Sequence, residues 1–78
     1  MRQWRSLVGG DHVVAEDRAG DRFHATICRV PAEHRDGWGS HFTTSRGGFP
    51  KAWIRPQDDP QADPVPWPVD HLHWPGPG

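Results

Sequence analysis

The sequence has few of the residues that mark a secreted, membrane-spanning or catalytic protein. Its 78 residues include one cysteine, one lysine and no tyrosine, and only 33% of them are hydrophobic. A single cysteine excludes an intramolecular disulfide, on which small secreted domains usually depend. No apolar run is long enough for a signal peptide or a membrane helix. We therefore expect a cytoplasmic protein without a membrane partner, made of one small domain of modest stability.

Charge and proline are distributed unevenly along the chain. Residues 1–56 contain all nine basic residues and six acidic ones, for a net charge of +3, whereas residues 57–78 contain four acidic residues and no basic one. Six of the nine prolines also lie in residues 57–78. Because proline has no N–H group to donate, we expect polyproline II rather than helix or sheet there. The chain then divides into a domain over 1–56 and an acidic tail over 57–78 that is extended or disordered on its own.

The alternation of apolar and polar residues predicts an all-β domain. It is clearest over residues 22–30, where Phe23, Ala25 and Ile27 alternate with polar side chains. Residues 32–35 form at most one helical turn within a polar loop over 31–37. Turns rich in glycine or proline separate four further strands, expected over residues 3–8, 12–17, 38–44 and 49–55. Five short strands with tight turns predict a small five-stranded antiparallel barrel.

Two runs lie on either side of a turn at Gly20: Val-Gly-Gly-Asp-His-Val-Val-Ala over residues 8–15 and Phe-His-Ala-Thr-Ile over residues 23–27. Together they resemble the opening hairpin of SH3-like barrels of the Tudor and KOW type. That hairpin often reads Val-Gly-Asp-x-Val-x-Ala, a glycine turn and then aromatic-x-Ala-x-Val. Phe42 before a glycine turn, and Trp-Ile-Arg-Pro over residues 53–56, also fit. The resemblance therefore covers residues 8–56, with an extra glycine in the first run and a long loop over 31–37. It implies an SH3-like barrel and, for the KOW type, a role at RNA or RNA polymerase.

Two other functions of SH3-like barrels lack their residues in this sequence. Methyl-lysine reading needs several aromatic rings around one cation, and neither of the corresponding loops, over residues 17–21 and 43–48, contains a ring. The plasmid-borne dihydrofolate reductase, a similarly short chain that works as a tetramer, carries Val-Gln-Ile-Tyr in its active-site strand, and this run is absent here. A small enzyme assembled only as an oligomer stays an alternative, because symmetric assembly can build a cleft that no single chain shows.

Histidine and cysteine form no pattern specific for catalysis or metal binding. His71 and His73 can reach one ion from an extended chain, but a metal site needs a third and usually a fourth ligand, so solvated histidines are the favoured interpretation. His24 and His41 lie on neighbouring expected strands and can pair, although two separate surface histidines are favoured. Cys28 lies too far along its strand from His24 to use that imidazole as a base. We expect no catalytic residue, no metal and no cofactor.

The leading hypothesis is a non-enzymatic protein-interaction module whose tail docks on a partner protein or a neighbouring subunit. The tail places Trp67, Leu72 and Trp74 among prolines. Tryptophan is enriched at the residues that carry most binding energy. A segment stiffened by proline also loses less conformational entropy when it docks.

The alternative hypothesis is a KOW-like nucleic-acid-binding barrel with which the acidic tail competes. Basic residues interleaved with aromatic rings can contact phosphates and stack on bases. A net charge of +3 over residues 1–56 is low for this function, since dedicated binders are usually more basic. The candidate contacts are Arg22, Arg29, Arg46, Lys51 and Arg55.

Overall fold

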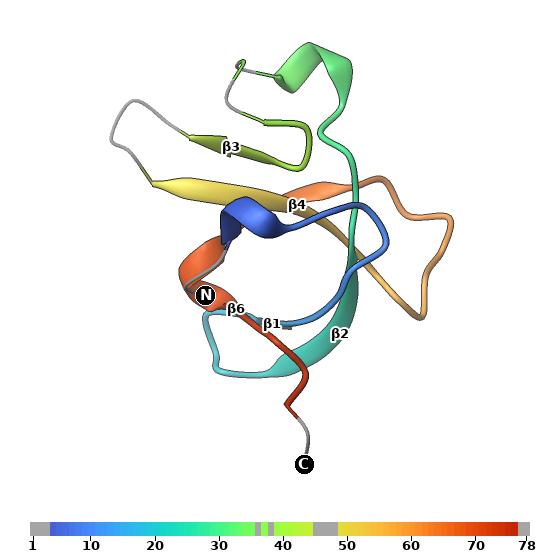
Figure 1. Cartoon of the computed structure of the whole chain (residues 1–78). Helices are drawn as coiled ribbons and strands as arrows, with labels where there is room; N and C mark the ends of the chain where they lie inside the picture. Colours follow the sequence, from blue (N-terminus) through green and yellow to red (C-terminus); the bar gives the residue numbers. More distant parts are fainter. Residues whose placement is uncertain (1–3, 36, 38, 45–48, 77–78) are drawn as a thin grey trace.

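Six strands form one strongly curled antiparallel sheet in the computed structural model, which describes residues 4–35, 37, 39–44 and 49–76 (Figure 1). The strands are β1 (His12–Glu16), β2 (Arg22–Ile27), β3 (Phe42–Thr44), β4 (Pro50–Pro56), β5 (Val65–Pro68) and β6 (Leu72–His73). Within the described residues the only helical segments are three short 3-10 turns: η1 (Trp4–Ser6), η2 (Ala32–His34) and η3 (Val69–His71).

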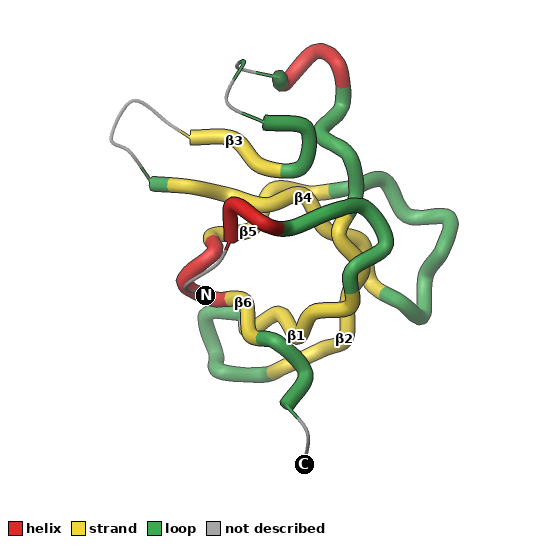
Figure 2. The backbone as a smooth tube through the Cα atoms, in the orientation of Figure 1, coloured by secondary structure: helices red, strands yellow, loops and turns green. Residues whose placement is uncertain are grey.

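Strand β4 lies at the centre of the sheet. It pairs with β2 and β3 along one edge and with β5 along the other. At the other end of the sheet, β1 pairs with β2 on one side and with β6 on the other. The short turn η3 therefore carries the chain from the strand beside β4 to the strand beside β1, and the curled sheet becomes a half-barrel (Figure 2). This arrangement is consistent with the SH3-like fold, and the expected all-β antiparallel class is confirmed, with six strands in place of five.

The inner side of the half-barrel holds the hydrophobic core. On β1 and β2 the buried residues alternate with more exposed ones, as the period of two requires. On β4 three successive residues, Ala52, Trp53 and Ile54, are buried, and of these Ala52 and Ile54 belong to the core. Three half-buried aromatic rings, those of Trp4, Phe23 and Trp67, pack against this core. Its members come from both ends of the chain: Leu7, Val13, Ala15, Ala25, Ile27, Ala52, Ile54, Val69 and Leu72.

The turn between β1 and β2 is shaped by Asp17. Its Oδ1 accepts the N–H groups of Ala19 at 2.9 Å and Asp21 at 3.0 Å. The backbone N–H of Asp17 donates to the carbonyl oxygen of Asp21 at 2.9 Å. Gly20 has a φ of +86°, a conformation that glycine adopts without steric cost. The residues of this turn are thus held in one defined shape.

The prediction of a first strand over residues 3–8 is wrong. Trp4–Ser6 form η1, and the N–H of Leu7 donates to the carbonyl oxygen of Trp4 at 3.3 Å, while Gln3 lies outside the described residues. Trp4 and Leu7 both pack on the core. Residues three apart face opposite sides of a strand but the same side of a helical turn. The turn is therefore the local structure that buries both side chains.

Two other expected strands are shorter than predicted. The strand over 22–30 ends at Ile27. The strand over 38–44 begins at Phe42, and Trp38 lies outside the described residues. Gly39 lies so close to the Phe42 ring that a Cβ atom would collide with it, and only glycine lets the chain pass there. The helical turn expected over residues 32–35 is confirmed as η2.

The proline-rich segment forms part of the sheet, so the expectation that its prolines exclude a strand is wrong. β5 pairs with β4 so that Trp67 lies opposite Ala52. Pro66 and Pro68 are two residues apart, and their missing N–H groups fall on the same side of the strand. Because β5 is an edge strand, it can leave that side unpaired. The segment also supplies core residues, and the behaviour of residues 57–78 on their own stays a prediction.

We predict that Leu72→Ala lowers the free energy of unfolding by about 2–5 kcal/mol, because Leu72 is fully buried and its truncation leaves a cavity. Trp74→Ala is the matched control from the same segment, since its side chain is 43% exposed and should cost less than about 1 kcal/mol. Urea unfolding followed by circular dichroism measures both values. Equal costs for the two variants would contradict the packing of β6 in the core.

Candidate functional site

Trp67 joins two parts of the sheet that do not pair with each other. It belongs to β5, which among the described residues pairs with β4 alone. Its indole Nε1–H donates to the backbone carbonyl of Glu16, the last residue of β1, at 3.1 Å. Its ring meets the Phe23 ring of β2 edge to face, with the centroids 5.5 Å apart and the planes at 89°. Trp67 thereby holds β5 against the β1–β2 hairpin.

A groove of about 620 Å³ opens beside Trp67. The β1–β2 turn forms one side of it, and β5 forms the other with Pro66, Trp67 and Pro68. Side chains from β4 and η3 complete the lining. The whole set is Glu16, Asp17, Arg18, Ala19, Lys51, Pro66, Trp67, Pro68 and His71. Apolar surface from one indole and two prolines thus lies next to five ionisable side chains.

The acidic side chains of the groove are already engaged with their own chain. The Oε1 atom of Glu16 lies 3.1 Å from Nε of Arg22 and 3.4 Å from Nε2 of His73. The carboxylate of Asp17 accepts the N–H groups of the β1–β2 turn. In the part of the chain that the structure describes, neither Arg18 nor Lys51 makes an ion pair. Arg18 and Lys51 are therefore the cations of the groove that no described carboxylate engages.

The three residues expected to bind a partner lie in three different settings. Trp67 is half-buried and lines the groove. Leu72 belongs to the core and has no exposed surface. Trp74 follows β6 and is 43% exposed. In the folded chain, the segment that carries them is docked on its own half-barrel.

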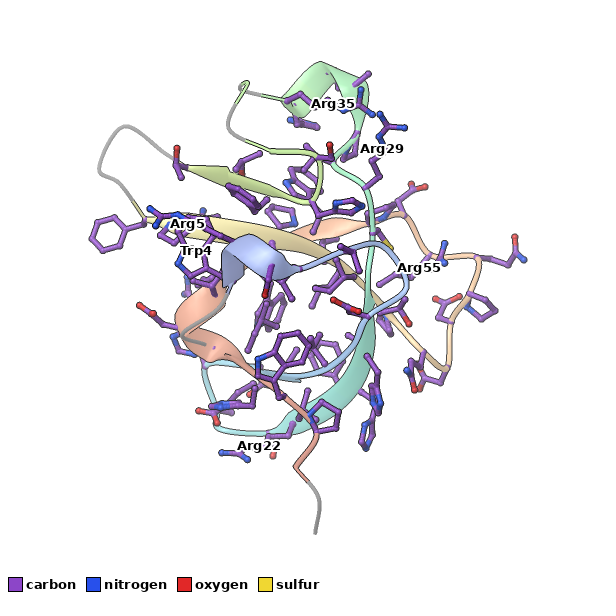
Figure 3. All side chains as sticks on the ribbon, in the orientation of Figure 1. Trp4, Arg5, Arg22, Arg29, Arg35 and Arg55 are labelled. Atoms are coloured by element: carbon purple, nitrogen blue, oxygen red, sulfur yellow. The ribbon has the colours of Figure 1, made fainter. Side chains whose placement is uncertain are left out.

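The basic residues expected to bind nucleic acid do not gather on one surface. Arg22 is ion-paired with Glu16, and Arg46 lies outside the described residues. Lys51 and Arg55 are four residues apart on β4 and so project to the same side of the strand, opposite to the core residues Ala52 and Ile54. Figure 3 shows Arg22 at one end of the molecule and Arg29, with its neighbour Arg35, at the other.

Histidine, cysteine and carboxylate side chains form no cluster of three among residues 4–35, 37, 39–44 and 49–76. No group of three or more His, Cys, Asp or Glu side chains in these ranges is placed to hold an ion. His71 is exposed on η3, and His73 contacts Glu16. The Sγ–H of Cys28 donates to the carbonyl oxygen of Thr26 at 3.6 Å. No helix in these ranges has the length and apolarity needed to cross a membrane.

Sequence reasoning selected two residues of the groove, Trp67 and Lys51, but for different functions. It missed Glu16 and Arg18, which come from the β1–β2 hairpin. The hairpin itself was predicted, and the several charged residues of its turn are the one signal in the sequence that could have indicated a binding surface there. Their proximity to Trp67 depends on β5 pairing with β4, a long-range contact that no local pattern shows.

Comparisons with protein-family models, with curated proteins and with solved structures find no match. The function is therefore inferred from the geometry of the groove and the chemistry of its residues.

We predict that Trp67→Phe lowers the free energy of unfolding by about 1–3 kcal/mol, because the ring contact with Phe23 is largely kept while the carbonyl of Glu16 loses its donor. Trp74→Phe makes the same chemical change at an exposed position and should leave stability within about 0.5 kcal/mol of the wild type. Urea unfolding checks both. If Trp67→Phe were as stable as the wild type, the indole hydrogen bond would not be holding β5 to the hairpin.

Proposed function

We propose that the protein is a non-enzymatic interaction module that binds an extended, acidic segment of a partner protein in the groove beside Trp67. The observation that carries this proposal is the pair of cations, Arg18 and Lys51, that are not ion-paired among the described residues and that flank the apolar surface of Trp67, Pro66 and Pro68.

The groove suits a short peptide segment in size and surface. Its volume of about 620 Å³ lies in the range of ligand pockets in proteins. Tryptophan and proline surfaces favour extended, proline-containing segments, whose backbone is already stiff before binding. Cations at the rim orient an acidic ligand and speed its association. Affinity would thus come from the apolar surface, and the preference for acidic sequences from Arg18 and Lys51.

The acidic, proline-rich segment of the chain supports this function by shaping the groove. The leading sequence hypothesis used that segment as the ligand of a partner or a neighbouring subunit. In the structure β5 and η3 line one side of the groove, and the adjacent β6 pairs with β1. Of the three candidate anchors, only Trp74 is exposed.

Selection of short random peptides displayed on phage tests the proposal. We expect the wild-type protein to enrich peptides rich in Asp and Glu. Arg18→Glu and Lys51→Glu should each weaken binding of a selected peptide by about tenfold or more, because a charge-assisted contact becomes a repulsion. Arg29→Glu is the control, since it makes the same change at an exposed position outside the groove.

The selected peptides and the two charge reversals also define the results that would contradict the proposal. Enrichment of basic peptides would rule out the groove as the binding site. So would acidic peptides that bind Lys51→Glu as tightly as they bind the wild type. Circular dichroism of each variant shows that lost binding does not come from lost folding.

The KOW-like nucleic-acid reading is the second candidate, and one observation favours it. Lys51 and Arg55 lie on the same outer side of the central strand β4, and neither is ion-paired among the described residues. Two such residues neutralise few phosphates, whereas nucleic-acid affinity rises with the number of phosphates contacted.

We therefore expect a fluorescent single-stranded RNA to show no measurable binding at about 150 mM salt, where weak non-specific contacts are largely screened. Fluorescence anisotropy of the RNA measures this. Tight binding with a steep salt dependence, weakened by Arg55→Glu but unchanged by Arg18→Glu, would favour the nucleic-acid function over the peptide-binding one.

A further inference from the structure

Two histidines on the outer side of the β1–β2 hairpin face each other. His12 and His24 alternate with buried residues of their strands, so both rings project away from the core. The register pairs Val14 with His24 and His12 with Thr26, which makes the two histidines diagonal neighbours. Nε2 of His12 lies 2.7 Å from Nδ1 of His24, and the ring centroids are 4.9 Å apart.

The pair has the chemistry of a metal-binding site that exchanges its ion for a proton. At 2.7 Å one nitrogen donates a shared proton and the other accepts it. Both nitrogens are therefore within reach of one small cation, and neutral imidazole is the commonest metal ligand in proteins. His24 is exposed and His12 is half-buried, so an ion can enter from solvent. The side chains can then turn until both lone pairs meet at the ion.

We propose that His12 and His24 bind a divalent late first-row transition-metal ion, with Cu²⁺ and Ni²⁺ preferred over Zn²⁺. With metal–nitrogen bonds of about 2.1 Å, the separation of 2.7 Å gives a nitrogen–metal–nitrogen angle of about 80°. This is close to the right angle of the tetragonal geometry that Cu²⁺ and Ni²⁺ adopt. The tetrahedral geometry of Zn²⁺ requires the two nitrogens to move further apart.

The surroundings leave room for the remaining ligands of the ion. His24 lines a second pocket, of about 500 Å³, together with Phe23, Gln57 and Asp58. The N–H of Gln57 donates to the carbonyl oxygen of His24 at 3.0 Å, which fixes the start of this loop beside the hairpin. Asp58 places a negative charge on the wall of the same pocket. Because no third His, Cys, Asp or Glu of the described residues joins the pair, water or a donor atom of a bound molecule fills the other positions.

Titration with the metal ions alone tests this site. Isothermal titration calorimetry of untagged protein near neutral pH, in a weakly coordinating buffer, should show one Cu²⁺ bound per chain and affinities in the order Cu²⁺, Ni²⁺, Zn²⁺. His12→Ala and His24→Ala should each weaken Cu²⁺ binding by about tenfold or more, since a single imidazole cannot chelate. His71→Ala removes an exposed histidine from η3 and should leave the affinity within about twofold.

Three results would overturn the site. These are no saturable binding of Cu²⁺ by the wild type, unchanged affinity in both His12→Ala and His24→Ala, and loss of binding in His71→Ala alone. If either alanine variant fails to fold by circular dichroism, His12→Gln and His24→Gln replace them. The groove plays no part in this test, so its outcome is independent of peptide binding.

Discussion

The half-barrel depends on a contact between β5 and β1, two strands of the curled sheet that do not pair with each other. β5 pairs with β4 and β6 pairs with β1, and η3 joins them, but nothing in the strand pairing holds β5 to the end of β1. Trp67 makes that connection with an indole hydrogen bond to Glu16 and an edge-to-face contact with Phe23. A large ring suits the position because it fills the gap and supplies a donor for a carbonyl at the end of a strand. The groove lies beside the Trp67 ring, along the edge strand β5.

This dependence makes the proline-rich segment inseparable from the domain. A small sheet has little apolar area to bury, so each fully buried side chain is a large share of its stability. Val69 and Leu72 belong to the core together with Val13 and Ile27, although more than forty residues separate the two pairs along the chain. Side chains of residues 57–76 therefore complete the core and form one side of the groove. Their acidic charge lies elsewhere, because Asp58, Asp63 and Asp70 are exposed and do not line the groove.

Strand alternation in the sequence was sufficient for the hairpin, where Val13 and Ala25 turn toward the core as the period requires. The apolar run that includes Ile54 was sufficient for β4. Local patterns gave wrong predictions where a helical turn or an edge strand decides which side chains are buried. Trp4 and Leu7 needed a helical turn to face the same way, and Pro66 and Pro68 fit a strand because that strand is an edge. The candidate site was harder to predict than the fold, since it combines Arg18, Lys51 and Trp67 from segments that only long-range pairing brings together. His24 was considered as a partner of His41, but the register of the hairpin places it beside His12.

The electrostatic preference of the groove depends on a residue outside it. Glu16 lies among its lining residues, and a free carboxylate there would offset one of the two cations, Arg18 and Lys51. Arg22 and His73 both reach the Glu16 carboxylate from neighbouring strands, at 3.1 Å and 3.4 Å. The pair with Arg22 is solvent-exposed and contributes little to stability, as exposed ion pairs generally do. Its effect is on the charge presented to a ligand: because Arg22 engages Glu16, that carboxylate does not pair with Arg18 or Lys51. The same register that opposes Glu16 and Arg22 also sets His12 beside His24 at the far end of the hairpin, so one strand pair shapes both the proposed peptide groove and the proposed metal-binding pair.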